Sequence, residues 1–384
     1  MKAMNYKEFS SHLITTENNN LIKTLAVLSA DSSRENNLLL AFASYHSFVY
    51  WQLFSLKSIS NNYFMSLLKL SNMDNIIPFQ EAEYNQQPTI MELNFISEQQ
   101  IYEYGFTIFN KRIIEEHLIV NDHVVYTRDT KKCSVGLEYE KIMYKNTEFY
   151  IQDNRLFCSV LSNMDIPEIT AIMEPFENFF NEQVTYYFDF LEPFQFLGNM
   201  VIEERIRKIM ENPDALNYGL EQLRKIGIPV EDCIFEYGLP MQRYNIKFQP
   251  AEVNEKNYME IRKMSNDTIK HLSLFIEIYN LSLKGGILIT DSNEFQPAAL
   301  KIIVDFFRQE NNKNMQLIFI TKNNSIINDQ KFRRDEVACI DVNESGKSRL
   351  YHLTDIKVCF DSGFSLDNLL NKYGDIALIK EYIL

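Results

Sequence analysis

The sequence predicts an α/β protein that combines a parallel sheet with an antiparallel meander. A short apolar run is followed by a turn and a helical pattern between Thr24 and Val49. Apolar and polar residues alternate from Thr89 to Asp129. Two buried-strand patterns with a helical pattern between them lie from Ile287 to Thr321. Strands that alternate with helices favour a parallel sheet, whereas an alternating run favours antiparallel strands with one solvated face.

The first element is predicted to be a strand over Thr24–Leu28, because this run is short and apolar. A helix is predicted over Asn37–Val49, where apolar side chains recur at helical spacing. These side chains are Leu38, Leu39, Phe42, Tyr45 and Val49. A strand, a turn and a helix in this order form the framework that a phosphate-binding P-loop requires.

The stretch Thr89–Asp129 predicts an antiparallel meander, because successive side chains of a strand point to opposite faces of a sheet. Asn-Lys and Asn-Asp pairs separate its runs and favour turns. The alternating apolar positions are Met91, Leu93, Phe95, Tyr102, Tyr104, Phe106 and Ile108.

Between about Leu156 and Gly227 the pattern becomes helical. The best-defined helix has Asn212 as its N-cap and Pro213 in its first turn, and it ends at Gly227. Its apolar face consists of Leu216, Leu220, Leu223 and Ile226. Heptads are not sustained, so no long coiled coil is expected.

The last predicted unit is a βαβ unit of a parallel sheet. Its strands are Ile287–Thr290 and Leu317–Thr321, and its helix is Ala298–Arg308.

Residues Ile22–Phe42 read IKTLAVLSADSSRENNLLLAF. This segment resembles, without a gap, the sequence I-K-S-A-A-I-Y-G-A-N-A-S-G-K-S-N-L-L-K-A-L of ABC-type AAA ATPases in bacterial abortive-infection and OLD-like proteins. A P-loop binds phosphate and magnesium with glycine amides, a lysine and a Ser or Thr hydroxyl. Here Ser29 and Arg34 replace glycines, Glu35 replaces the lysine and Asn36 replaces the serine.

The exchange of a lysine for Glu35 places like charge beside a triphosphate. At about 4 Å and an effective dielectric near 20, each such pair is unfavourable by roughly 4 kcal/mol. Arg34 carries positive charge, but its side chain occupies a place where the backbone has to approach the phosphate. We therefore interpret the segment as a lost phosphate site. The alternative for this segment taken alone is a strand, loop and helix of an unrelated fold.

The stretch Met264–Ile327 resembles the signature, Walker B strand, D-loop and histidine switch of the same family, in the correct order. In that family an Asp that holds Mg²⁺ and a Glu that orients the attacking water follow the Walker B strand. Thr290 and Asp291 stand in these places, and Lys322 replaces the histidine. Asp291 is one methylene shorter than Glu and would hold a water out of line.

The signature segment keeps Ser265 and Thr268, but Asp267 replaces its glycine. The resemblance implies that this segment faces the nucleotide of a partner subunit, where a carboxylate would repel phosphate. Alternatively, Asp267 is an ordinary acid in the first turn of a helix. The two interpretations of Asp267 are equally compatible with the sequence.

Framework matches extend the resemblance over nearly the whole chain. They are Ile101–Val120, Phe332–Asp335, Arg349–Asp355 and Lys372–Ala377. The resemblance implies an ABC-type ATPase head, made of a mixed sheet with an antiparallel meander plus a parallel P-loop-like core, with a helical insertion. The implied domains are residues 1–150 as the N-terminal half of the head, 151–255 as the helical insertion, and 256–384 as the C-terminal half.

The composition is acidic, with 38 basic and 52 acidic residues and a formal charge of −14. This charge disfavours a large phosphate-binding surface and therefore direct nucleic-acid binding. Five cysteines without a C-x-x-C arrangement, no leading signal peptide and no apolar run of membrane length predict a reduced, cytoplasmic protein without a membrane contact.

Two further patterns each allow two interpretations. The first pattern could suggest a metal site and consists of Glu115, Glu116, His117, Asp122 and His123. Strand alternation separates Glu116 from His117, so solvated hairpin residues are the better interpretation. The aromatic stretch Phe176–Phe196 is either a protein-contact surface or helical core, and core is favoured.

These observations predict a catalytically inactive ATPase-like subunit that acts through protein contacts, and the resemblance points to anti-phage defence. No cofactor and no bound metal are expected. The expected partner is an active ATPase paralogue, a second copy, or an effector or toxin encoded beside it. One alternative is a divergent ATPase that uses Arg34, Lys322 and Asp291. Another is a nucleotide-independent nucleic-acid clamp.

Overall fold

The computed structural model describes the chain in segments. They are residues 22–29, 39, 42–43, 45–46, 48–50, 52–54, 87–140, 149–187, 212–238, 243–250, 259–260, 266–292, 295–312, 314–322, 327, 332–342 and 348–353.

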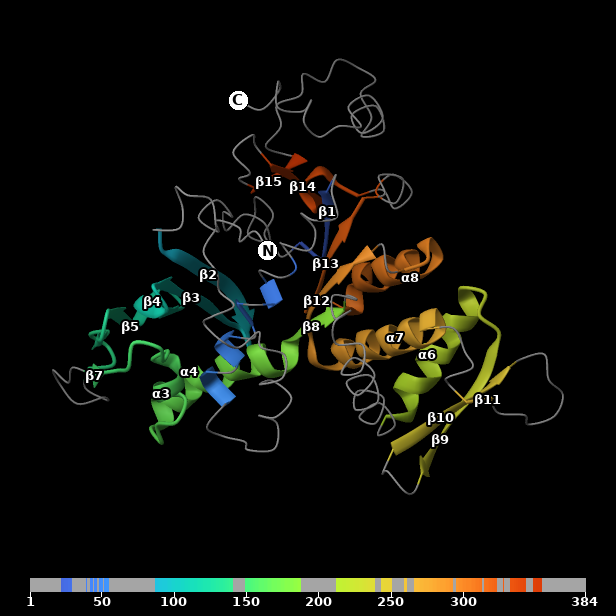
Figure 1. Ribbon diagram of the computed structural model, residues 1–384, viewed down its shortest axis with the longest axis horizontal. Helices are drawn as coiled ribbons and strands as arrows, with labels where there is room; N and C mark the ends of the chain where they lie inside the picture. The colour runs from blue at the N-terminus through green and yellow to red at the C-terminus, as the bar shows by residue number, and fades with distance from the viewer. Residues whose placement is uncertain are drawn as a thin grey trace, which may run out of the picture.

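A six-stranded sheet with the strand order β15-β14-β1-β13-β12-β8 forms the centre of the protein (Figure 1). Its strands are β1 (Thr24–Ser29), β8 (Val184–Tyr187), β12 (Gly286–Asp291), β13 (Met315–Thr321), β14 (Val337–Val342) and β15 (Ser348–His352). All neighbours are parallel except β14 and β15. The predicted strand at Thr24–Leu28 and the predicted βαβ unit are confirmed.

Helices cover one face of this sheet, and the meander lies on the other side (Figure 1). The covering helices are α7 (Asn266–Lys284) and α8 (Pro297–Arg308), and α6 (Pro213–Lys225) packs against α7. Ala26 and Leu28 of β1 belong to the apolar core beneath these helices. Leu25 and Val27 belong to a second core on the opposite face, together with Leu39 of the helix that follows β1. The strand is therefore buried on both faces, as expected for a parallel sheet.

The predicted meander is confirmed as a second six-stranded sheet, with its strands in sequential order. Its strands are β2 (Thr89–Ser97), β3 (Gln100–Phe109), β4 (Arg112–Val120), β5 (His123–Asp129), β6 (Lys132–Val135) and β7 (Phe149–Tyr150). Pairs of residues with positive φ close three of its hairpins, as two-residue hairpin turns require. These pairs are Glu98 and Gln99, Asn110 and Lys111, and Asn121 and Asp122.

The inner face of the meander packs against α3 (Cys158–Leu161), α4 (Pro167–Asn178) and a π-helix (Phe179–Gln183). Phe176, Phe179 and Phe180 are buried there, which agrees with the core interpretation for this part of the aromatic stretch. Residues 188–196 lie outside the described part of the chain.

Helix α6 follows its sequence signals closely. The Asn212 side chain accepts a hydrogen bond from the amide of Ala215 at 3.3 Å, so Asn212 is the N-cap. Gly227 has a φ of +85°, a conformation that favours glycine after a helix end. Leu220 and Leu223 are buried in the apolar core that α6 shares with α7.

The region 151–255 contains α3, α4 and α6, but it also contains strands. β8 joins the parallel sheet by pairing with β12. β9 (Val230–Gly238) and β10 (Arg243–Pro250) form an antiparallel sheet with β11 (Met259–Glu260). The division into three domains stays a prediction.

The structure corrects the expectation that Glu116 is solvated. Glu116 is 1% exposed, and its carboxylate accepts hydrogen bonds from four groups besides Arg128. The donors are the hydroxyls of Tyr104 and Tyr126, the amides of Phe157 and Cys158, and the guanidinium of Arg128. The carboxylate therefore joins β3, β4 and β5 to the start of α3. The predicted separation of Glu116 from His117 is confirmed, because His117 lies on the outer face and contacts Glu103 at 3.8 Å.

The Glu116 network predicts a large loss of stability on substitution. Glu116→Gln leaves the Arg128 guanidinium, whose side chain is 0% exposed, without its counter-ion. Breaking a buried ion pair from one side costs about 3–5 kcal/mol, so we expect a loss of this size in the free energy of unfolding in urea. The control is Glu92→Gln on the exposed face of β2, for which a change within about 0.5 kcal/mol is expected. Equal stabilities of the two variants would contradict this account.

The helix after β1 contains a histidine that predicts pH-dependent stability. Burial lowers the pKa of His46 from 6.5 to about 4, and its ring lies 5.7 Å from that of Phe180. The unfolded state therefore binds more protons between these two pH values. Neutral His46 therefore contributes fully to the free energy of unfolding above pH 6.5, and this contribution is lost as the pH falls towards 4. The loss in the free energy of unfolding is up to about 3 kcal/mol.

In unfolding experiments across this pH range, His46→Gln is expected to flatten the decrease in stability. His123→Gln is the control, because the side chain of His123 is 56% exposed. A pH dependence that persists unchanged in His46→Gln would exclude His46 as its source.

Candidate functional site at the carboxyl edge of the parallel sheet

The strands β1, β12 and β13 are parallel, so their carboxyl ends lie at one edge of the sheet. Val27 pairs with Ile320, and Ile320 pairs with Asp291. The ends of β1 and β12 are thus separated by two strand spacings, or about 10 Å. Open α/β sheets bind ligands at the carboxyl ends of their strands. This edge is therefore the candidate functional site.

The structure brings several of the sequence-predicted positions to this edge. Ser29 ends β1, Thr290 and Asp291 end β12, and Lys322 directly follows β13. Arg34, Glu35, Asn36 and Ser265 lie outside the described residues.

Thr290 is the residue at the position of the metal-binding carboxylate in the resemblance. It pairs with Phe319 of β13 and Tyr187 of β8, and its exposed fraction is 0%. Its neighbour Leu288 belongs to the core beneath α7 and α8, so alternation places Thr290 on that face. A neutral hydroxyl at this position lacks the charge with which a carboxylate binds Mg²⁺.

Asp291 lies on the opposite face of the sheet from Thr290. Ile289 belongs to the core on the opposite face of the sheet, and Asp291 shares that face by strand alternation. Asp291 is half-buried. The one carboxylate in the last two residues of β12 therefore points away from the position that Thr290 occupies.

Helix α7 begins close to this edge and carries Asp267 in its first turn. Asp267 is exposed, whereas Thr268 is buried. A carboxylate in a first helical turn interacts favourably with the positive end of the helix dipole. The location agrees with an ordinary first-turn acid, and a role in repelling a partner's nucleotide stays a prediction.

His271 is a site residue that the sequence analysis missed. It is 1% exposed, and its Nδ1 lies 2.5 Å from the carbonyl oxygen of Asp267. The amide of Gln296 donates to Nε2 at 3.4 Å. Because Nε2 accepts, Nδ1 carries the proton and donates to the Asp267 carbonyl. His271 thus connects the start of α7 to the start of α8, and a buried polar residue on a largely apolar helix was its only sequence signal.

Among the described residues, no group of three His, Cys, Asp or Glu side chains lies close enough together to hold a metal ion. Cys133, Cys158 and Cys339 are buried. Burial raises the pKa of Cys158 well above its ordinary value, so this thiol is a poor nucleophile.

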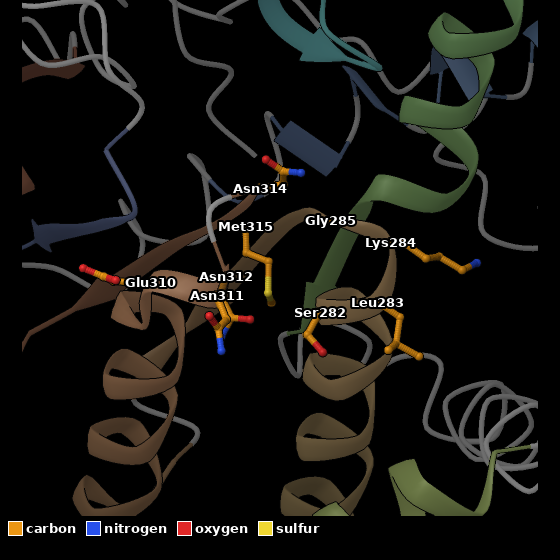
Figure 2. A pocket seen from close by; sticks show the side chains of 9 residues that line it. All are labelled: Ser282, Leu283, Lys284, Gly285, Glu310, Asn311, Asn312, Asn314 and Met315. Atoms are coloured by element: carbon orange, nitrogen blue, oxygen red, sulfur yellow. The ribbon is translucent and has the colours of Figure 1, made fainter.

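A pocket of about 410 Å³ lies at the opposite edge of the sheet, where α7 ends and β13 begins (Figure 2). Its charged lining residues are Lys284 and Glu310, and their side chains point in opposite directions in Figure 2. Lys284 forms an ion pair with Glu182 at 2.7 Å. The pocket has no converging charged groups and is distant from the carboxyl edge.

No helix in the described part of the chain is both long enough and apolar enough to cross a membrane.

No protein-family model matches the sequence, and no curated protein matches it. Solved structures of SMC heads are similar in chain path. An Smc head bound to the C-winged helix domain of ScpA is 13% identical, with a TM-score of 0.48 over 86% of this chain and 91% of that structure. An Smc head from Pyrococcus furiosus, bound to the C-terminal domain of ScpA, is 11% identical, with a TM-score of 0.42 over 93% of this chain and 94% of that structure. The SMC head of Thermotoga maritima is 10% identical, with a TM-score of 0.39 over 87% of this chain and 92% of that structure.

At these identities and TM-scores, the likenesses assign no activity, ligand or partner to this chain. The fold class rests on the strand order itself. A mainly parallel sheet with β1 at its interior, combined with an antiparallel meander, fits the ABC-type ATPase head predicted from the sequence.

Proposed function

We propose that the protein is a catalytically inactive, ATPase-like subunit that acts through contacts with other proteins. The observation that carries this proposal is the fully buried, neutral Thr290 at the end of β12. A P-loop ATPase needs a carboxylate there to hold Mg²⁺, because the metal neutralises the charge that develops on the transferred phosphate. Asp291 lies on the other face of the sheet and cannot hold the metal in the same place.

The sequence of the P-loop segment supports the same proposal independently. Glu35 in the place of the lysine makes the approach of a triphosphate unfavourable by roughly 4 kcal/mol for each close pair. Ser29 and Arg34 in the places of glycines add side chains where the backbone has to approach phosphate. Hydrolysis of ATP would therefore need other groups to hold the metal and, separately, other groups to hold the phosphate.

The biological setting of the proposal comes from the resemblance to abortive-infection and OLD-like ATPases, which suggests a role in anti-phage defence. In such a role the retained head would present a fixed surface to an active paralogue, a second copy or an effector. The binding of a partner protein, instead of the binding of nucleotide, would then determine the conformation of the head.

Isothermal titration with MgATP tests the proposal. We expect no saturable heat, because the chain lacks the groups that hold phosphate and metal. A micromolar dissociation constant would contradict the proposal. Phosphate release that disappears in Asp291→Asn would identify a divergent ATPase instead.

A matched gain-of-function variant shows that the assay can detect binding. It restores the motif residues of the resemblance while the framework stays unchanged. The substitutions are Ser29→Gly, Arg34→Gly, Glu35→Lys, Asn36→Ser and Thr290→Asp. This variant is expected to bind MgATP measurably more tightly than the natural chain, because the strand order already brings two of the restored positions, Ser29 and Thr290, to one edge.

A further inference from the structure

The outer face of the meander carries an unusual concentration of exposed apolar side chains. Five large apolar residues are exposed in the described part of the chain, and four of them lie on or directly after meander strands. These four are Ile96, Ile101, Val124 and Leu137, with exposed fractions of 45%, 58%, 41% and 83%. Singly exposed apolar residues are common, but contiguous ones mark contact surfaces.

The strand register makes these residues neighbours. Ile96 of β2 pairs directly with Ile101 of β3. Ile119 of β4, which is half-buried, pairs directly with Val124 of β5. Ile119 also pairs with Glu103, which is two residues from Ile101 on the same face. Ile101 and Ile119 are thus diagonal neighbours, and the four side chains form one strip across four strands.

Leu137 extends this strip beyond β6. The amide of Gly136 donates to the carbonyl of Val125 at 2.9 Å, which places the residues after β6 beside the start of β5. We call the set Ile96, Ile101, Ile119, Val124 and Leu137 the apolar strip. It lies at the hairpin end, which we define by the turns at 98–99 and 121–122 and the segment 136–140.

Acidic side chains surround the apolar strip. Carboxylates at the hairpin end or beside the strip are Glu98, Glu103, Asp122, Glu138 and Glu140. His123 also lies there and contacts Glu138 at 3.0 Å. No described Lys or Arg lies at the hairpin end.

The opposite end of the meander carries both signs of charge. Its two turns hold Lys111, Arg112, Lys131 and Lys132, but Asp129 pairs with Lys132 across one of them. Asp153 contacts Arg112 at 3.6 Å and Lys131 at 3.4 Å. The hairpin end, in contrast, carries carboxylates without Lys or Arg among the described residues. A partner that covers the strip gains from apolar burial and from complementary positive charge.

The dimensions of the strip fit one short helix. The apolar strip crosses β2, β3, β4 and β5 and reaches the segment after β6, so it spans about four strand spacings, or about 19 Å. An α-helix of about 13 residues has this length. One face of such a helix presents apolar residues at positions i, i+3, i+4 and i+7, while the flanks can carry Lys or Arg.

We propose that the apolar strip docks a basic amphipathic helix of a protein partner. This inference deepens the proposed function, since it names the surface and the partner chemistry of a subunit that acts through protein contacts. A second copy of the same surface fits poorly, because two acidic hairpin ends would face each other. A nucleic acid is repelled by the same carboxylates.

A designed helical peptide of about 14 residues, with Leu on one face and Lys on the other, is the probe. Fluorescence anisotropy is expected to show saturable binding that weakens with added salt. The double variant Ile101→Thr and Val124→Thr is expected to weaken binding at least tenfold, since it removes apolar area while threonine keeps the strand preference. Charge reversal by Glu98→Lys and Glu138→Lys is expected to have a similar effect.

The matched control reverses charges at the opposite end of the meander with Lys111→Glu and Lys131→Glu, and binding is expected to stay within twofold. A second control peptide with Glu in place of Lys is expected not to bind. Circular dichroism checks that each variant is folded.

Absence of saturable binding by the Leu/Lys peptide would overturn the proposal, and so would equal binding by all variants. Self-association in sedimentation that is lost in Ile101→Thr with Val124→Thr would also overturn it and would assign the strip to a second copy. These results are independent of MgATP titration, so a failed docking surface and a failed inactive-ATPase proposal are distinguishable.

Discussion

The structure depends on the parallel pairing of β1 with β13 on one side and β14 on the other. This pairing buries β1 on both faces, with Ala26 and Leu28 in one apolar core and Leu25 and Val27 in the other. A one-residue slip would exchange the two sets of side chains, so the register is strongly specified. The carboxyl end of β1 is therefore held beside that of β13 and two strands from that of β12. The location of the candidate site at this edge of the sheet follows from this constraint, irrespective of the residues that occupy it.

A second set of contacts attaches the meander to this sheet. Val184 of β8 and Ile287 of β12 pack against both the meander core and the core on the near face of the parallel sheet. Inside the meander, the Glu116 carboxylate and the Arg128 guanidinium satisfy backbone groups at the start of α3 and in the preceding loop. The parallel sheet and the meander are thus joined by apolar packing, and the meander contains a fully buried polar network. Thr290 lies apart from these contacts, at the carboxyl edge of the parallel sheet. The contacts that hold the fold together therefore do not depend on which residues occupy the carboxyl edge of the parallel sheet.

Much of the fold could be predicted because its local signals agree with the tertiary structure. The run Thr24–Leu28 and the βαβ unit are strongly apolar, the meander alternates, and Asn212 and Gly227 mark the ends of α6. β8 could not be predicted, because it follows directly on a π-helix and its strand character depends on pairing with β12. The sheet of β9, β10 and β11 was missed as well.

The residue environments were harder to predict than the elements. Alternation correctly places Glu116 and His117 on opposite faces, but it does not say which face is buried. The partners of Glu116 come from β3, β5 and α3, which are far apart in the sequence, so its burial is a tertiary property. His271 was missed for the same reason, since its contact with Gln296 crosses between two helices. The candidate motif positions, in contrast, come directly from the sequence, because the resemblance assigns each a residue, and their loss of function stays a prediction.

The central claim is that the nucleotide-binding framework persists without the groups that hold nucleotide. A crystal structure grown with Mg²⁺ and a non-hydrolysable ATP analogue tests it most directly. The account predicts no triphosphate at the carboxyl edge and a Thr290 side chain that stays buried on the face of the sheet that carries α7 and α8. Electron density for a magnesium-bound triphosphate against residues 29–36 would contradict it.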